Sequence, residues 1–301
     1  MGNVRMAELY APLFSSLEEI EQFQRSIKPR ALGMHVQFFE RAASTNDLAL
    51  EAGRNGAPHG SVFIADAQDS GRGRRGRSWE CPPGMGLLFS VLVRPLPAPP
   101  QLAGWIPLLA GLACAQACAE ISPRCIDVTL KWPNDIVLPC DESPGWKKLG
   151  GILCESVLSA QSADSFGAQD SFAVIGIGLN VNQLPKMLPE MTKAPATSLR
   201  MIAKKQLDRR KLLKLLLECL DDNIESFRDK SSNSLALLAV RDRMSNFFYK
   251  RRLLLSAPAA GNQDAREHAG YFEGLDEFGR LLIRENGEVR AFADAEISAL
   301  K

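Results

Sequence analysis

The chain has 301 residues, 46% of them hydrophobic and 24% charged, a balance that excludes a disordered or collagen-like protein. Its 36 Lys and Arg against 35 Asp and Glu give a formal net charge of +1. A chain so close to neutral is not a general nucleic-acid coat, although it can still carry a local basic site. At roughly 100–200 residues per domain, the length allows one large domain or two unequal ones.

Seven cysteines are spread along the chain at spacings that form no disulfide framework. No signal peptide precedes them, so reduced core thiols in a cytoplasmic protein are expected. The chain has no Cys-x-x-Cys pair and only three histidines, which argues against a zinc cluster. We expect His35, His59 and His268 to be structural or surface groups.

The first two thirds of the chain predict strands interrupted by helices. A short helix is expected over Ser15–Phe23, and Ser44 is expected to cap a second helix, with the acid Asp47 three residues on. The apolar stretch Leu102–Ala119 contains Pro, Gly and many small residues, which favour a buried or interface helix over a membrane span. Strands are expected at 36–40, 61–65, 87–93, 128–132, 149–157 and 172–181, and surface loops at 139–147 and 159–171.

The last third begins with an amphipathic helix and ends in short strands. Leucines and other apolar residues recur at 3–4 spacing through Asp208–Arg228. Asn286-Gly287 is a strong hairpin signal among strands expected at 252–256, 270–275, 280–284 and 289–293. We therefore divide the chain into a catalytic-type domain at 1–246 and a small β domain at 247–301.

A basic, glycine-rich segment follows the strand expected at 61–65. Residues 71–77 contain four arginines and three glycines, with Trp79 just behind them. Arginine offers charged, bidentate donors to phosphate or carboxylate, and glycine lets the backbone approach a ligand. We expect this loop to repel itself and to be mobile when empty, and to become ordered around an anionic ligand. The alternatives are a solvated loop or a nucleic-acid patch. It is not a Walker loop, because no Gly-Lys-Ser or Gly-Lys-Thr follows.

Three further motifs place polar groups or glycines at strands. Lys131–Asp135 (Lys-Trp-Pro-Asn-Asp) leaves a cation, an amide and a carboxylate at the end of a strand, or else forms an ordinary turn. Two lysines precede Gly150-Gly151, which is also the pattern of a hairpin return. The segment Gly176–Asn182 lacks the third glycine and the following helix of a dinucleotide fingerprint. Its glycines favour close approach of a flat ligand, and Asn180 suits an adenine edge.

Taken together and in this order, the motifs resemble those of the biotin protein ligase family. The resemblance is close over roughly residues 35–185 and loose in the C-terminal β region. It implies an α+β fold: a mixed, largely antiparallel sheet flanked by helices, as in class II aminoacyl-tRNA synthetases, with a small C-terminal SH3-like β-barrel. Members with a DNA-binding head carry an extra N-terminal domain, for which this chain has no room, so the resemblance is to the headless type. The matching pieces are Ser44-Thr45-Asn46, Gln68 with Gly71–Gly76, Lys131–Asp135, Lys148–Leu153 and Gly176–Asn180.

The resemblance also implies roles for individual residues. No protein side chain is expected to bind a metal, and Mg²⁺ would be held through phosphates. The family's late arginine, which is often lent to ATP, has no counterpart in Ser298-Ala299-Leu300-Lys301. The biotin-binding residues would be Ser44, Thr45, Asn46, Gln68, Arg72, Gly73, Arg74, Lys148, Gly150 and Gly151. The ATP- and adenylate-binding residues would be Arg74, Arg75, Trp79, Lys131, Asn134 and Asn180, and the catalytic residues Arg72, Lys131, Lys148 and Asp135.

The implied reaction joins two anions and then transfers an acyl group. The biotin carboxylate attacks the α-phosphorus of ATP to form biotinyl-5'-AMP, and a lysine amine of a biotin carboxyl carrier protein then attacks the adenylate. The carboxylate is ionised near neutrality, so the obstacle is repulsion and no base is needed in the first step. Asp135 would orient the incoming amine or take its proton. No DNA or membrane partner is implied, and monomer and homodimer stay open.

Three rival interpretations are retained. A lipoate-type ligase would run the same adenylation on another acid, although the arginine loop is typical of the biotin family. A nucleic-acid-binding protein would use that loop as a patch whose binding weakens steeply with salt. A non-catalytic biotin sensor would require the loss of a motif residue, and all of them are present in the sequence.

Overall fold

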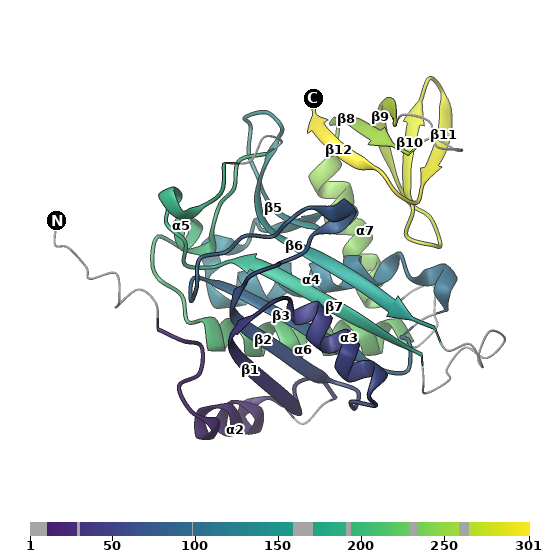
Figure 1. Cartoon of the computed structure of the whole chain (residues 1–301). Coiled ribbons are helices and arrows are strands. Elements are labelled where there is room, and N and C mark those ends of the chain that lie inside the picture. Colours follow the sequence, from purple (N-terminus) through teal and green to yellow (C-terminus); the bar gives the residue numbers. More distant parts are fainter. Residues whose placement is uncertain are drawn as a thin grey trace, which may run out of the picture.

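The computed structural model describes residues 11–28, 31–97, 99–158, 171–190, 194–228, 234–258 and 265–301. The chain forms one large sheet with helices on both faces, and a small β unit at its C-terminal end (Figure 1). The loop expected at 159–171 lies outside the described residues except for Ser171.

Seven strands make up the large sheet. The first two neighbours pair in parallel, and all other neighbours are antiparallel. Every strand expected in this part of the chain is present, whereas β5 was not foreseen. In their order across the sheet, the strands are β1 (His35–Ala42), β2 (Ser61–Gln68), β3 (Gly86–Val93), β7 (Phe172–Asn180), β6 (Trp146–Val157), β5 (Asp135–Pro139) and β4 (Thr129–Lys131).

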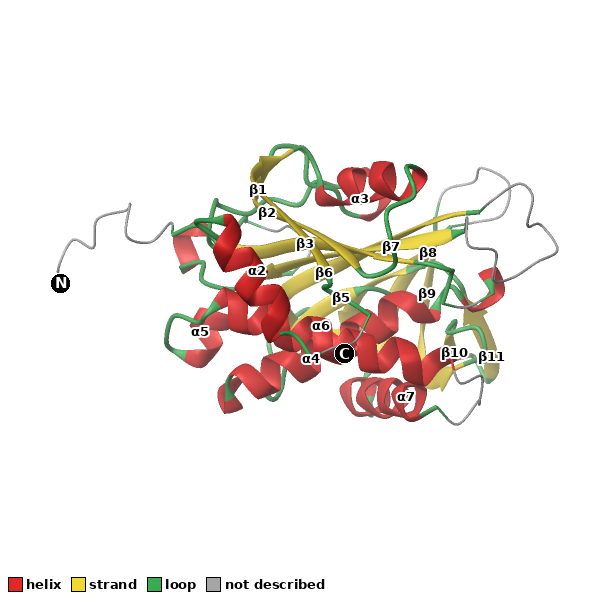
Figure 2. Cartoon of the chain, turned by 90° about the horizontal axis from the view of Figure 1, so that it is seen from below, coloured by secondary structure: helices red, strands yellow, loops and turns green. Residues whose placement is uncertain are grey.

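Helices cover the sheet from both sides. Helix α3 (Thr45–Arg54) lies on one face, and α4 (Trp105–Ile121) and α6 (Arg209–Arg228) lie on the other (Figure 2). Because both faces are covered, β3 is buried along its whole length and reads as a continuous apolar run. The expected mixed, largely antiparallel sheet flanked by helices is confirmed.

Helix α4 is the buried helix that the sequence predicts. It is apolar all round and packs between the sheet and α6, with most of its residues buried. In the part of the chain that the structure describes, no helix has the length and apolar character needed to cross a membrane.

The C-terminal unit is an antiparallel sheet of five strands. The four strands expected at 252–256, 270–275, 280–284 and 289–293 are all present. The fifth strand, at Glu296–Leu300, and helix α7 (Leu235–Phe248) were not predicted. Phe247 and Phe248, at the end of α7, pack in one core cluster with leucines of the small sheet, so α7 connects the large sheet to the small one. The domain boundary at 247 stays a prediction. In sheet order, the strands are β11 (Glu288–Phe292), β10 (Leu281–Glu285), β9 (Arg266–Leu275), β8 (Arg252–Ala257) and β12 (Glu296–Leu300).

Two further α-helices, α2 and α5, lie among the described residues. Helix α2 (Leu17–Ser26) is the helix expected near Ser15, and the hydroxyl of Ser16 caps it by accepting from the backbone N–H of Glu19. Helix α5 (Leu199–Ala203) was not predicted.

Candidate ligand-binding site

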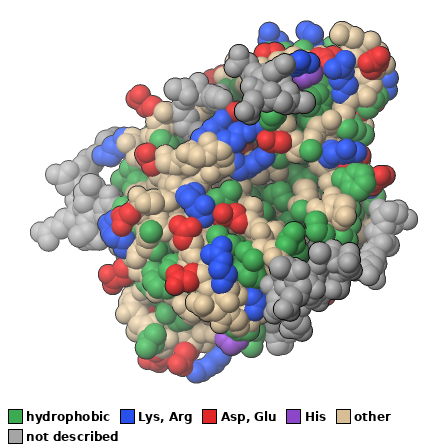
Figure 3. All heavy atoms as spheres, turned by 45° about the vertical axis from the view of Figure 1, so that its right-hand side comes forward, with side chains coloured by type: hydrophobic (Ala, Val, Ile, Leu, Met, Phe, Trp, Pro, Cys, Tyr) green, Lys and Arg blue, Asp and Glu red, His purple; other side chains and the backbone are tan. Residues whose placement is uncertain are grey.

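A cavity of about 520 Å³ opens on the sheet beside the first turn of α3. Its walls come from the N-terminus of α3, the arginine loop 71–77, strands β2 to β7 and the start of β12. Lys, Arg, Asp and Glu side chains gather across one face of the molecule (Figure 3). Of the residues that the sequence singles out, the cavity is lined by Ser44, Thr45, Asn46, Gln68, Arg72, Gly73, Arg74, Arg75, Trp79, Lys131, Asn134, Asp135, Lys148, Gly151 and Asn180.

Gly150 is the exception. A Cβ atom placed there would lie 2.5 Å from Cδ2 of Leu179 and 2.7 Å from the carbonyl oxygen of Gly178. Gly150 therefore serves close packing within the sheet, outside the lining of the cavity.

One end of the cavity is a network of neutral polar groups. The backbone N–H and the hydroxyl of Thr45 donate to Oε1 of Gln68, at 2.8 Å and 3.1 Å. Because the oxygen of Gln68 is occupied twice, its amide N–H groups remain for a ligand. The hydroxyl of Ser90, which the sequence gave no reason to select, lies 2.8 Å from Oγ1 of Thr45 and 2.6 Å from Oδ1 of Asn46.

The start of α3 differs from the expected capping box. Ser44 occupies the N-cap position, but its side chain makes no cap hydrogen bond. Asp47 instead accepts from Nη2 of Arg72 at 2.6 Å. The predicted start of the helix is confirmed. The predicted capping hydrogen bonds are wrong, because the carboxylate of Asp47 pairs with the guanidinium of Arg72, 25 residues further along the chain.

The floor of the cavity is made of glycines. A Cβ at Gly176 would lie 1.9 Å from Oδ1 of Asn46, and one at Gly178 would lie 2.7 Å from Nε1 of Trp79. The indole of Trp79 therefore lies against the strand that carries Gly178, and among the described residues its buried N–H has no hydrogen-bond partner. The expected close approach of a flat ligand to these glycines stays a prediction, and in this structure the indole of Trp79 lies over Gly178.

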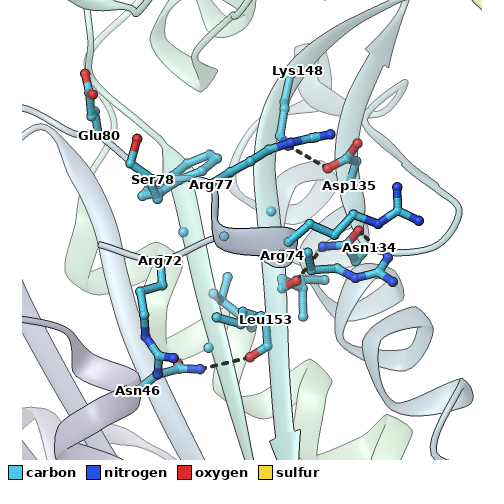
Figure 4. Close-up of a pocket in the computed structure, with 18 of the residues that line it drawn as sticks. Asn46, Arg72, Arg74, Arg77, Ser78, Glu80, Asn134, Asp135, Lys148 and Leu153 are labelled. Carbon is cyan, nitrogen blue, oxygen red and sulfur yellow. Dashed lines mark hydrogen bonds and ion pairs between the residues drawn. The ribbon is translucent and has the colours of Figure 1, made fainter. Parts of the chain in front are cut away.

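Two lysines share one carboxylate at the other end of the cavity. Nζ of Lys131 lies 3.0 Å from Oδ2 of Asp135. Nζ of Lys148 lies 2.7 Å from Oδ1 of the same carboxylate (Figure 4). The hairpin of β4 and β5 pairs Lys131 with Asp135, and β6 brings Lys148 alongside. Burial alone would raise the pKa of Asp135, but the two ammonium groups hold it well below its usual range. A carboxylate held so firmly in the ionised form is a poor proton acceptor. Of the two roles expected for Asp135, this favours orienting the incoming amine over taking its proton.

The arginines of the loop are paired with carboxylates. Arg72 bridges Asp47 and Glu155, at 2.6 Å and 2.9 Å, and Arg74 donates to Asp294 at 2.6 Å. The remaining two arginines of the loop contact Asp294 and Glu296. The expectation that the empty loop repels itself is therefore wrong, because neighbouring acids compensate its charge.

The C-terminal unit thus contributes to the site through acids. Asp294 precedes β12 and Glu296 begins it, and Ala295 and Glu296 line the cavity. The family resemblance implies an arginine late in the chain, but Ser298-Ala299-Leu300-Lys301 contains none. The acids were missed because Asp294 and Arg74 are 220 residues apart in the chain, and no local pattern links them.

The two expected nucleotide-side amides are already engaged. Asn134 donates to the carbonyl of Ile152 at 2.6 Å and accepts from Arg74 at 3.3 Å. Asn180 donates to the carbonyl of Thr197 and accepts from Gln183, both at 3.1 Å. Each keeps one N–H and one lone pair for a ligand.

The remaining titratable groups do not suggest a metal or thiol chemistry. Across the described residues, no three His, Cys, Asp or Glu side chains are grouped to hold a metal ion. All seven cysteines are free, and burial raises the pKa of the Cys81 thiol, near the cavity, to about 12. No histidine lines the cavity.

The lining of the cavity suits a compact ligand with a neutral polar head and an anionic tail. The head would meet hydroxyl and amide groups, the middle would lie on glycines, and the negative charge would meet lysines and arginines. This is the kind of site in which two anionic reactants can be brought together.

Comparison with known proteins places the chain more closely. A model of the Biotin/lipoate A/B protein ligase family matches residues 38–166. The chain is 32% identical to the bifunctional ligase/repressor BirA of Bacillus subtilis over 90% of this chain and 76% of that protein. It is 30% identical to the biotin--[acetyl-CoA-carboxylase] ligase of Mycobacterium tuberculosis over 92% of this chain and 96% of that protein.

A solved structure agrees with these sequence matches. The biotin protein ligase of Aquifex aeolicus in complex with biotin and ATP superimposes with a TM-score of 0.67, at 28% identity, over 89% of this chain and 97% of that chain. The chain belongs to the biotin protein ligase family.

Proposed function

We propose that this chain activates biotin with ATP as biotinyl-5'-AMP and transfers the biotinyl group to a lysine of a biotin carboxyl carrier protein. The observation that carries the proposal is the cavity itself. A neutral polar end, a glycine floor and an end with two lysines follow one another over the strands, and arginines stand above them. The family resemblance and the solved relative with biotin and ATP support the same reaction.

Biotin's ring would enter at the polar end. A ureido group brings two N–H donors and one carbonyl acceptor, and burying it requires a partner for each. The free amide N–H groups of Gln68 suit the carbonyl, and the hydroxyls of Ser44 and Thr45 suit the N–H groups. The ring and its tail would lie along Gly176 and Gly178, so Trp79 would shift to cover them.

The reacting carboxylate would then point to the lysine pair. Lys131 and Lys148 are fixed by Asp135 before any ligand arrives, so no reorganisation is needed when charge develops at the α-phosphate. Arg72 and Arg74 would close over the anhydride and keep water away from it. One preorganised donor of this kind lowers the barrier by on the order of 3 kcal/mol.

Mg²⁺ fits this site as a partner of the nucleotide. The carboxylate nearest the lysines, Asp135, is occupied by them, while Glu80 and Glu190 line the cavity. Mg²⁺ is usually bound by one or two carboxylates, waters and substrate phosphates, and it would neutralise phosphate charge. The chain's own lysines and arginines supply the remaining compensation.

For the second step, Asp135 would orient the incoming lysine amine. It lies at the end of the cavity where the anhydride forms, and it already holds two ammonium groups. The acceptor lysine would have to arrive as the neutral amine, because two ammonium groups and one carboxylate leave a net positive charge that repels a third ammonium. The amine N–H would donate to a remaining lone pair of Asp135 while the amine nitrogen attacks the anhydride carbonyl, AMP leaves with its phosphate, and the released proton passes to water. The acceptor would have to deliver this lysine from the open side of the cavity.

One assay tests the proposal. The purified chain is incubated with radiolabelled biotin, ATP and Mg²⁺, and biotinyl-5'-AMP and pyrophosphate are measured, first alone and then with a carrier domain. We expect adenylate without the acceptor and labelled acceptor with it, while an acceptor whose target lysine is Arg stays unlabelled. A chain that activates lipoate in preference to biotin, or neither acid, contradicts the proposal.

A further inference from the structure

We propose that Asp294 is a positioning residue that holds Arg74 and Arg75 in the ligand-free loop and competes for them with the phosphates of ATP. The C-terminal β unit would thereby set the affinity of the cavity for nucleotide. This inference rests on the proposed function, since it takes ATP as the ligand. Whereas an arginine in this segment would attract the phosphates of ATP, Asp294 and Glu296 would compete with them for the arginines of the loop.

The contacts that carry the inference join the two units of the chain. One oxygen of Asp294 lies 2.6 Å from Nη2 of Arg74, and the other lies 2.9 Å from Nη2 of Arg75. Both oxygens of this carboxylate are therefore used by two different guanidinium groups. Glu296 adds Arg77 at 2.5 Å and Arg75 at 3.7 Å. Three arginines of the loop are thus paired with two acids of the C-terminal unit, which leaves one positive charge.

The same arginines face the cavity. Arg74, Arg75 and Arg77 all line it. Nη1 of Arg74 also contacts Oδ1 of Asn134, another lining residue, at 3.3 Å (Figure 4). A carboxylate and a phosphate present the same kind of acceptor to a guanidinium, so one arginine fork cannot serve both fully. A triphosphate entering the cavity has to replace Asp294 as the acceptor.

The backbone of the loop indicates that the ligand-free arrangement is held from outside. Arg75 has a left-handed conformation with φ of 56°, which is unfavourable for a residue with a Cβ. Its guanidinium contacts Asp294 and Glu296. These contacts hold the strained turn, and loss of Asp294 would free the turn to relax.

The exposure of the pair makes it suitable for exchange. The side chain of Asp294 is 42% exposed and that of Arg74 is 32% exposed. Ion pairs that remain this accessible to water are individually weak. A ligand with several negative charges can therefore displace Asp294, whereas the largely buried Asp135 would stay with its lysines.

The experiment measures nucleotide binding with and without the competing carboxylate. The full chain with saturating biotin and Mg²⁺ is titrated calorimetrically with α,β-methylene-ATP. In this analogue a methylene group replaces the oxygen that bridges the α- and β-phosphates, so the bond that the reaction breaks cannot be cleaved. We expect Asp294→Asn to bind this analogue about three- to tenfold more tightly than the wild type, from the loss of two exposed pairs. Asp294→Glu, which keeps the charge, should bind like the wild type. Glu288→Gln removes one negative charge from an exposed strand of the same unit, and this variant should bind the analogue as tightly as the wild type does.

A second readout needs no ligand. Trypsin should cut the ligand-free Asp294→Asn chain after Arg74, Arg75 or Arg77 several times faster than the wild type, at equal thermal stability. Equal or weaker binding of the analogue by Asp294→Asn, with unchanged cleavage, overturns the inference. If the analogue binds neither protein, competition with ATP and the proposed function are both rejected, and the cleavage rates still show whether Asp294 holds the loop.

Discussion

The cations at the two sides of the cavity are compensated in different ways. Lys131 and Lys148 stand on strands and share one carboxylate whose side chain is 17% exposed. The arginines of the loop rest on acids that are more open to water, among them Asp47 and Asp294 at 52% and 42% exposed. The lysine side is built before a ligand arrives, and the arginine side has to exchange partners when one binds. A site that joins two anions uses both: fixed charge where the bond forms and exchangeable charge where the ligand enters.

Removing a fixed cation should have the largest effect. We expect Lys148→Ala to lower the rate of adenylate formation about a hundredfold, because a preorganised donor at the α-phosphate is lost. The rate is measured by biotin-dependent exchange of pyrophosphate into ATP. Lys147→Ala is the matched control, since its ammonium pairs at 3.8 Å with Glu142 near the surface. Near-normal turnover of a folded Lys148→Ala chain would remove Lys148 from the mechanism.

Removing the shared carboxylate should destabilise the fold. We expect Asp135→Asn to lower the free energy of unfolding by about 3 kcal/mol at pH 7, because two lysines then lose their buried counter-charge. Urea unfolding with the two proteins side by side measures this. The folded-state pKa of Asp135 is lowered, so its stabilisation is complete above the unfolded pKa of about 3.9 and is lost as the pH falls below it. The difference between the two proteins should therefore shrink below about pH 4; a constant difference down to pH 2 speaks against the assignment.

The glycine floor gives a smaller, local effect. Gly176→Ala would push a methyl group to within 1.9 Å of Oδ1 of Asn46 and displace the polar network. An overpacked site typically loses 1–3 kcal/mol, so we expect biotin to bind about tenfold more weakly in calorimetry. Gly151→Ala should weaken biotin binding less, because its methyl group would lie at an ordinary contact distance of 3.6 Å from Trp79. The reverse order would mean that Asn46 does not position the ligand.

The arginine loop should show the smallest change, because it is already held without ligand. Biotin and ATP together should slow tryptic cleavage within 72–77 a few fold, as the arginines leave their carboxylates for phosphate and remain covered. Fragments are followed by mass spectrometry, with cleavage at Lys186 outside the loop as the internal reference. Equal cleavage of the loop with and without ligands argues against its closure.

The sequence predicts the sheet and the cavity well, for a physical reason. Strands such as β3 are buried on both faces and therefore read as apolar runs, and α4 is apolar all round. Some motif residues that line the cavity stand where strands end or begin, such as Lys131 at the end of β4 and Asp135 at the start of β5, and Pro133 between them is visible in the sequence. Strand β5 follows Pro133 so closely that it looked like part of a turn, and β12 is short and ends the described chain.

What the sequence could not predict is how charges are paired across the fold. Asp47 looked like the acid of a capping box, and only the folded chain shows it beside Arg72. Ser90 sits in the middle of an apolar strand with no neighbouring signal, yet its hydroxyl joins Thr45 to Asn46. Long-range pairs of this kind depend on topology, whereas capping, turns and periodicity are local.

The contact between Arg74 and Asp294 also has a consequence for how the protein is made. On the ribosome the guanidinium-rich segment emerges 220 residues ahead of the acid that receives it. Until β12 docks, that segment has no carboxylate from the C-terminal unit beside it, and the part of the cavity lined by Ala295 and Glu296 is missing. Maturation of the binding site is therefore coupled to the synthesis and docking of β12.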